Sequence, residues 1–130
     1  MGMGQMDAFC EMAWSQGDDL YGYDDNRFMK AAQYVATYNL GGDVPFTTYT
    51  WGSGPSCARM SQTVISSDSR GQVRPVWDIL HYHYVGRRKL SVPSITAIAE
   101  QGRPEGGGGD DGSDSGGFDQ LGFGTLMYAK

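Results

Sequence analysis

The chain has 130 residues and a net charge of −5, so it forms one domain at most and its surface as a whole is a poor partner for nucleic acid or anionic membranes. Glycine occupies 20 positions, far above the usual share of about 7%. No apolar run approaches the length of about 18 residues that predicts a membrane span. Much of the glycine falls in residues 106–117, so the part of the chain able to form a core is shorter than its length indicates.

The N-terminal residues lack the basic region and apolar stretch of a signal peptide. The chain instead begins inside a predicted helix, which indicates a truncated start. Cys10 and Cys57 are the two cysteines. They could pair in an oxidising compartment or remain as two buried free thiols, because two cysteines do not make a disulfide framework.

Helical spacing of apolar residues predicts a first helix over residues 3–16, ended by Gly17. A second helix is predicted over residues 26–39, with Asp24 or Asp25 as its N-cap. Because the connection is short, we expect these two helices to pack antiparallel as a hairpin.

Residues 43–73 are polar and rich in glycine, proline and serine, so an irregular loop is expected there. A third helix should open at Arg74-Pro75 and end at the basic run of residues 87–89. A fourth, shorter helix should begin at Pro93 and stop at Gly102.

Residues 106–117 are predicted to form a flexible Gly/Asp/Ser-rich loop. The apolar tail, residues 118–128, should return to the body as an extended segment. The succession of helix pairs predicts an all-α chain of antiparallel helix hairpins that form part of an α/α toroid. Residues 1–130 would then be a single partial domain.

A set of short motifs resembles the alginate-lyase-domain family of secreted microbial and fungal proteins. The longest is Trp14-Ser-Gln-Gly-Asp-Asp-Leu-Tyr-Gly-Tyr-Asp-Asp-Asn-Arg27. Others, in chain order, are residues 11–14, 38–40, 43–46, 74–77, 83–84, 103–106 and 122–126. The match is weakest over residues 47–72. No single motif is specific, so the resemblance depends on their order and spacing over most of the chain.

The resemblance implies a secreted polysaccharide lyase that cleaves uronate-containing polysaccharide by β-elimination within an α/α toroid. This chemistry needs a neutralised carboxylate, a Tyr or His base, and an acid that protonates the leaving oxygen. It requires no cofactor, and no metal in principle. In the family, a Gly-Arg-Asp-Gln-x-His-Thr segment with the natural catalytic candidates precedes the helix that residues 3–16 match. This sequence lacks that segment, so we expect the C-terminal portion of a lyase, inactive on its own.

His83 and Tyr84 are the tentative catalytic residues, because a His-Tyr pair on a helix can bind a uronate or transfer a proton. The alternative is that both rings pack against neighbouring helices. Arg74 is a candidate for binding a substrate carboxylate, since a guanidinium pairs with a carboxylate in a bidentate way. It could equally pair with an acidic side chain at the start of the helix.

Trp51 and Trp77 are candidates for stacking on sugar rings. Trp77 lies on an apolar stripe, so core packing is the competing interpretation, whereas Trp51 lies in the predicted loop. The acidic residues of the 106–117 segment do not have the spacing of a twelve-residue calcium loop, so no metal site is predicted.

Two other functions remain open beside the lyase portion: a non-catalytic glycan-binding or accessory module, and a truncated gene product without activity. The first helix carries more apolar residues than one partner helix should cover. They are Met3, Met6, Phe9, Cys10 and Trp14. The sequence therefore also predicts self-association through exposed helix faces.

Overall fold

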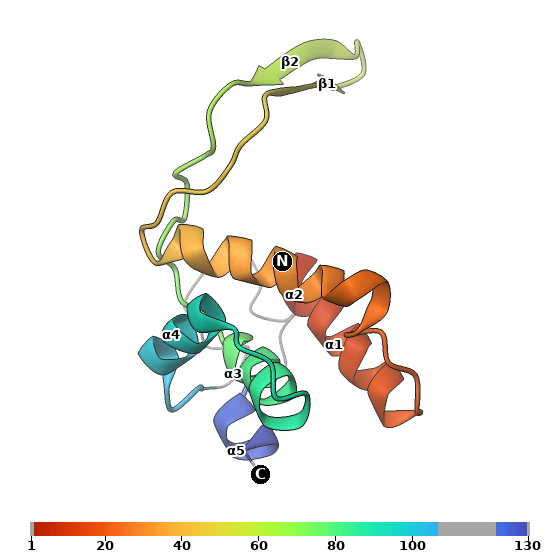
Figure 1. Ribbon diagram of the computed structural model, residues 1–130. Helices are drawn as coiled ribbons and strands as arrows, with labels where there is room; N and C mark the ends of the chain where they lie inside the picture. The colour runs from red at the N-terminus through yellow and green to blue at the C-terminus, as the bar shows by residue number, and fades with distance from the viewer. Residues whose placement is uncertain (1, 107–121, 130) are drawn as a thin grey trace.

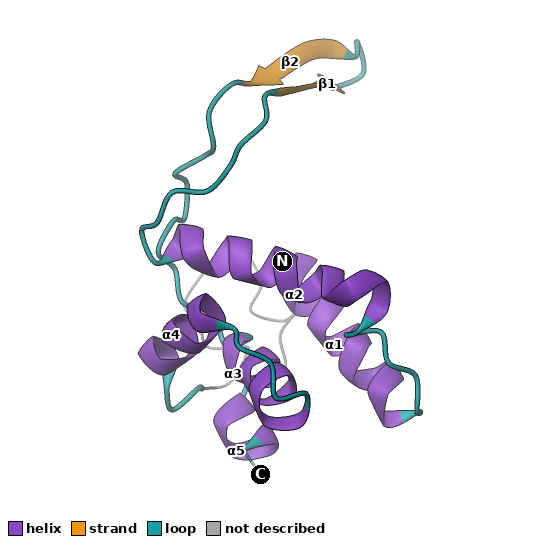
Figure 2. Ribbon diagram, viewed as in Figure 1, coloured by secondary structure: helices purple, strands orange, loops and turns teal. Residues whose placement is uncertain are grey.

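The computed structural model describes residues 2–106 and 122–129. Its elements, in chain order, are α1 (Gly2–Ser15), α2 (Tyr23–Asn39), β1 (Tyr49–Ser53), β2 (Ala58–Gln62), α3 (Trp77–His81), the π-helix η1 (Tyr82–Arg87), α4 (Pro93–Gly102) and α5 (Gly124–Tyr128). The helices gather into one body, and the two strands stand away from it at the end of two long connecting segments (Figures 1 and 2). Within the described residues, no helix has the length and apolar character needed to cross a lipid bilayer.

The core lies between α2, α3, η1 and α4, and the closest helix packing is of α4 against α2 and α3. Its fully buried side chains include Ala32, Ala36, Leu80, Tyr84, Ile95 and Ile98. Burial of a large apolar side chain contributes about 1.5–3 kcal/mol.

The predicted fourth helix is confirmed, because α4 begins at Pro93 and ends at Gly102. Proline suits the first helical turn, where its missing N–H leaves no bond unmade. The Gln33 side chain accepts a hydrogen bond from the Ile95 amide at 2.8 Å, and so attaches the start of α4 to α2.

The start of α2 differs from the prediction. Asp24, Asp25 and Asn26 adopt left-handed backbone angles, with φ of 49°, 53° and 56°. No side chain caps the helix, and Asp24 and Asp25 instead form ion pairs with Arg27 and Lys30. The predicted aspartate N-cap is therefore wrong, because a cap residue needs an extended backbone to reach the first free amides.

The third helix is also different from the prediction, because α3 begins at Trp77 rather than at Arg74-Pro75 and continues as the π-helix η1. The wider turn is seen where the Arg88 amide donates to the carbonyl of His83 at 3.0 Å. π-helical turns are rare and occur often at functional sites.

The predicted all-α fold is wrong, because β1 and β2 form an antiparallel two-stranded sheet. They belong to a projecting segment, residues 44–67, which we call the arm. β1 contains Tyr49, Thr50 and Trp51, and the two strands flank a turn closed by a hydrogen bond from the Cys57 amide to the Gly54 carbonyl at 3.0 Å. These residue types favour strands over the predicted irregular loop.

The predicted slice of an α/α toroid is wrong as well. α1 and α2 are joined by a short turn, but the closest packing is not between them. An apolar groove of about 420 Å³ lies along them, lined by Met6, Phe9, Cys10, Leu20, Tyr23, Arg27, Phe28 and Ala31. The expected stack of antiparallel hairpins is therefore absent from the part of the chain that is described. The predicted flexible loop falls, beyond Gly106, outside the described residues.

The C-terminal helix α5 is attached to the body by two buried carboxylates. Glu105 accepts hydrogen bonds from the Asp78 amide at 3.1 Å and from the Gly124 amide at 2.8 Å. Asp78 pairs with Arg103 at 2.7 Å and accepts a short hydrogen bond from Thr125. The tail thus returns to the body as predicted, but as a helix rather than an extended segment.

Replacing Gly124 with alanine is expected to lower the free energy of unfolding by about 1–3 kcal/mol through overpacking. A Cβ atom there would lie 2.8 Å from Asp78 Cβ and 3.2 Å from Glu105 Cδ. Chemical denaturation measures the effect, and faster amide hydrogen exchange over residues 122–129 should accompany it. Gly106→Ala is the matched control, because nothing lies within 4 Å of the added atom. Equal stability of the two variants would contradict the packing described for α5.

Candidate functional site

Arg74 and Trp77, both predicted to bind substrate, line the same cavity of about 240 Å³. The indole of Trp77 is 4% exposed, and its Nε1 donor has no hydrogen-bond partner among the described residues. Arg74 donates to Gln72 Oε1 from Nε at 3.2 Å and from Nη2 at 2.9 Å. This contact orients the guanidinium group at the cavity wall.

The other walls of this cavity are of mixed character. Asn39 is held in place, since its Nδ2 donates to the Val35 carbonyl at 2.9 Å and its Oδ1 accepts from the Gly71 amide at 3.0 Å. The complete lining is Met3, Gly4, Val35, Asn39, Ser69, Gln72, Arg74, Val76 and Trp77. Among the described residues, the lining includes no acidic side chain, and Arg74 is its charged member. The cavity is therefore suited to an anion with an apolar face.

His83 and Tyr84 lie inside the helical body, with 1% and 0% of their surfaces exposed. The His83 ring stacks on Tyr21 at 3.7 Å between centroids and meets the edge of Trp14 at 4.8 Å. The Tyr84 hydroxyl donates to the Tyr21 carbonyl at 3.2 Å. Both rings thus pack among neighbouring helices, which is the second of the two interpretations open for this pair.

Burial, together with the nearby Arg87 guanidinium, lowers the pKa of His83 to about 4. Its Nε2 has no hydrogen-bond partner among the described residues, and its Nδ1 lies 3.5 Å from Arg87 Nη1. Burial likewise raises the pKa of the Tyr84 hydroxyl above its ordinary value. Near neutral pH the pair is therefore uncharged and enclosed, which does not suit proton transfer to a sugar in solution.

A buried polar network beside His83 was not predicted. Asp7 is 2% exposed, and it accepts a hydrogen bond from the Tyr21 hydroxyl at 2.9 Å. Burial is the main cause that raises its pKa well above the ordinary value, and the Tyr21 hydrogen bond acts in the opposite direction. Glu11 binds Arg87 through two bonds of 2.9 Å each. The network joins α1 to η1 and holds the aromatic stack around His83.

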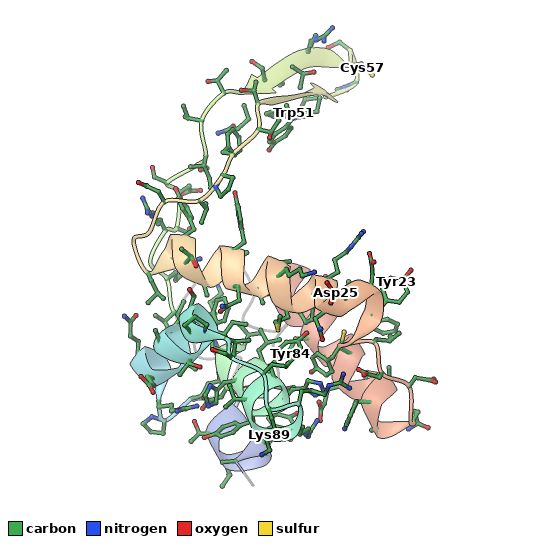
Figure 3. All side chains as sticks on the ribbon, in the orientation of Figure 1. Tyr23, Asp25, Trp51, Cys57, Tyr84 and Lys89 are labelled. Carbon is green, nitrogen blue, oxygen red and sulfur yellow. The ribbon has the colours of Figure 1, made fainter. Side chains whose placement is uncertain are left out.

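The arm carries the third candidate, Trp51, in a row of aromatic rings. Tyr49 lies 5.3 Å from Trp51 and 6.2 Å from Phe46, measured between centroids. Trp51 and Tyr49 are 39% and 54% exposed. Figure 3 shows Trp51 far from Tyr84, so the predicted residues fall into separate places rather than one site.

Arg59 faces Gly52 in the strand register, one step from the pair of Trp51 with Met60. Because successive residues alternate between the faces of a strand, Arg59 lies on the face opposite Trp51. The aromatic face of the arm therefore has no charged group of its own. It can stack on a ring, but it cannot neutralise a carboxylate.

Cys10 and Cys57 are both free thiols, so no disulfide joins them, but the expectation that both thiols are buried is wrong for Cys57. Cys10 is buried, and burial raises its pKa to about 11, whereas Cys57 is exposed at the tip of the arm. Among the described residues, no group of three or more His, Cys, Asp or Glu side chains is placed to hold a metal ion.

No protein-family model, curated protein or solved structure matches this chain. The resemblance to the alginate-lyase-domain family therefore stays a prediction that depends on the ordered motifs. In the structure, the longest motif, from Trp14 to Arg27, forms the end of α1, the connecting turn and the left-handed start of α2.

Proposed function

We propose that this chain is the uronan-binding portion of an alginate-lyase-like polysaccharide lyase, and that the Arg74–Trp77 cavity binds the carboxylate of a uronate residue. One observation supports this proposal most strongly. Arg74 and Trp77 line one cavity in which the described residues include no acidic side chain, and the buried indole N–H of Trp77 has no hydrogen-bond partner among the described residues. A charge-assisted hydrogen bond from Arg74 and a neutral one from Trp77 would satisfy a carboxylate there.

The size and walls of the cavity support a single sugar unit as its ligand. Its volume of about 240 Å³ is below the range of about 300–1,000 Å³ that is usual for drug-sized ligands. Met3 and Val76 offer apolar surface to the C–H face of a sugar, and Asn39 and Ser69 offer polar groups to its hydroxyls. Trp51 and Tyr49 on the arm supply a separate stacking surface for a longer chain.

Proton abstraction is not assigned to this portion. His83 and Tyr84 are enclosed by aromatic rings, and the pKa of His83 is lowered to about 4. In the proposal these two residues stabilise the body, and the base and acid of β-elimination belong to another part of the lyase.

Calorimetry with uronate oligosaccharides should detect saturable binding that Arg74→Gln weakens by about 10- to 100-fold, the loss expected for hydrogen bonds to a charged group. Trp77→Phe keeps the ring and removes the N–H, so we expect a loss of about 3- to 10-fold. Arg59→Gln is the matched control, since it removes the same charge from the arm, away from the cavity. Circular dichroism of each variant separates lost binding from lost folding.

Three results would contradict the proposal. Equal binding of a neutral oligosaccharide would show that the carboxylate is not recognised. Absence of binding to any uronan would favour the alternative of a gene product without activity. Release of unsaturated uronate ends, followed by their ultraviolet absorbance, would show that the chain alone carries the catalytic groups.

The exposed side of α1 supports the predicted self-association, which we also propose. Met6, Phe9 and Met12 are 48%, 56% and 67% exposed. Together with the groove along α1 and α2, they form an apolar surface of the kind that marks interaction sites.

A further inference from the structure

The arm is attached to the body at a defined root. Tyr34 and Tyr38 of α2 donate hydrogen bonds from their hydroxyls to the carbonyls of Pro45 at 2.7 Å and Ser66 at 2.8 Å. Arg70 donates to the carbonyls of Tyr38 at 2.9 Å and Gly42 at 3.0 Å, and its guanidinium lies over the Tyr38 ring. Both connecting segments are thus held, which gives the arm a fixed point of departure from α2.

Beyond this root, β1 and β2 pair with each other and are otherwise exposed. Every residue of β1 and β2 is exposed except Gln62, which is half-buried. Figures 1 and 2 show the strands well away from the helices. A two-stranded hairpin alone is marginally stable in water. An attached hairpin with no cover is therefore suited to an interaction outside its own chain.

The edge of β1 lacks the usual features that prevent pairing with another strand. Natural edge strands are protected by lysine and other charged residues, by proline, or by bulges. Residues 44–67 contain one charged side chain, Arg59, which lies in β2, and Pro55 lies in the turn rather than in a strand. β1 also carries threonine, tyrosine and tryptophan, which favour extended structure.

We infer that the arm pairs edge to edge with the arm of a second copy of this chain, giving a continuous antiparallel sheet. The charge distribution allows two arms to meet. The chain has 15 acidic and 10 basic residues, and none of the acidic ones lies in residues 44–67. Two arms therefore meet without carboxylate repulsion, and the contact is separate from the one proposed for the exposed side of α1.

Antiparallel pairing also suits an edge that meets its own copy, because a two-fold axis perpendicular to the sheet relates the two strands. That axis keeps equivalent faces on the same side. Tyr49 and Trp51 of both copies would then form one longer aromatic surface. The pairing does not depend on the proposed function, because it uses the edges of the sheet and not the Arg74–Trp77 cavity.

Sedimentation velocity over a range of concentrations tests the pairing. We expect a reversible dimer, and we expect Thr50→Lys combined with Ser61→Lys to weaken it at least tenfold by placing a charge on each strand. Gln101→Lys adds the same charge at an exposed position of α4 and should leave the dimer unchanged. Phe9→Lys changes the exposed side of α1, so it reports on association through helix faces.

Cys57 provides a second measurement, because its thiol is exposed while that of Cys10 is buried. Spin labels on Cys57 of two paired arms should lie at opposite ends of the four-stranded sheet and give one defined separation. A dimer lost in Phe9→Lys but kept in the double lysine variant would overturn the inference. A parent chain that stays monomeric at all concentrations would overturn it too, and neither result bears on uronate binding.

Discussion

Replacing Tyr84 with alanine is expected to lower the free energy of unfolding by about 3–5 kcal/mol, the cost typical of deleting a large buried aromatic side chain. Tyr84 has no exposed surface, and its ring meets the edges of Tyr21 and His83. Small domains have a total stability of about 5–15 kcal/mol, so this variant should lose a large share of its stability. Chemical denaturation followed by circular dichroism measures the change.

Two further variants separate the contribution of the Tyr84 hydroxyl from that of its buried ring. Tyr84→Phe removes the hydroxyl that donates to the Tyr21 carbonyl, so a loss of about 1 kcal/mol is expected. Trp51→Ala deletes an aromatic ring on the exposed arm and should change stability by no more than about 0.5 kcal/mol. Unchanged stability of Tyr84→Ala would show that the ring is not part of the core.

Elements with strong local signals were predictable from the sequence. Pro93 and Gly102 mark the two ends of α4 directly, and Gly17 adopts the positive φ of 96° that ends α1 where expected. The left-handed start of α2 was not predictable in this way. Aspartate and asparagine are common both as caps and in left-handed turns, so their identity does not distinguish the two.

The arm was missed for a related reason. Its strands have no buried face, and so the alternation of apolar and polar residues that predicts a strand is absent. Threonine and aromatic residues were the available signal, but serine, glycine and proline around them indicated a loop. An all-α fold was therefore predicted, because the serine, glycine and proline residues indicated a loop more strongly than the threonine and aromatic residues indicated a strand.

The candidate site was predictable as separate residues but not as a group. Arg74 and Trp77 were each chosen for their chemistry, and their shared cavity also depends on Asn39 of α2 and Met3 of α1. The pair of Glu11 with Arg87 joins residues 76 positions apart, a contact that periodicity does not reveal. Asp7 lies among apolar neighbours in α1, and only its burial identifies it.

Asp7→Asn is expected to raise the free energy of unfolding near neutral pH and to leave it nearly unchanged in acid. Burial raises the pKa of Asp7 above its ordinary value of 3.8. Below pH 3.8 the Asp7 carboxyl is protonated in both the folded and the unfolded chain, so its contribution to stability is fully present. As pH rises, the unfolded chain ionises first, and stability is lost until the folded pKa is passed. Glu105, whose pKa is also raised by burial, acts in the same direction.

His83 has the opposite dependence, because its folded pKa of about 4 lies below the ordinary value of 6.5. The contribution of His83 to the free energy of unfolding is fully present above pH 6.5. It falls by at most about 3 kcal/mol as the pH decreases towards 4. His83→Phe keeps a ring against Tyr21 and should remove this loss of stability at acid pH. Asp7→Asn should remove the loss of stability that occurs as the pH rises towards neutral. Denaturation curves over this pH range measure both. A common profile for the two variants and the parent would mean that neither group is buried from water, and the described burial of Asp7 and His83 would then have to be abandoned.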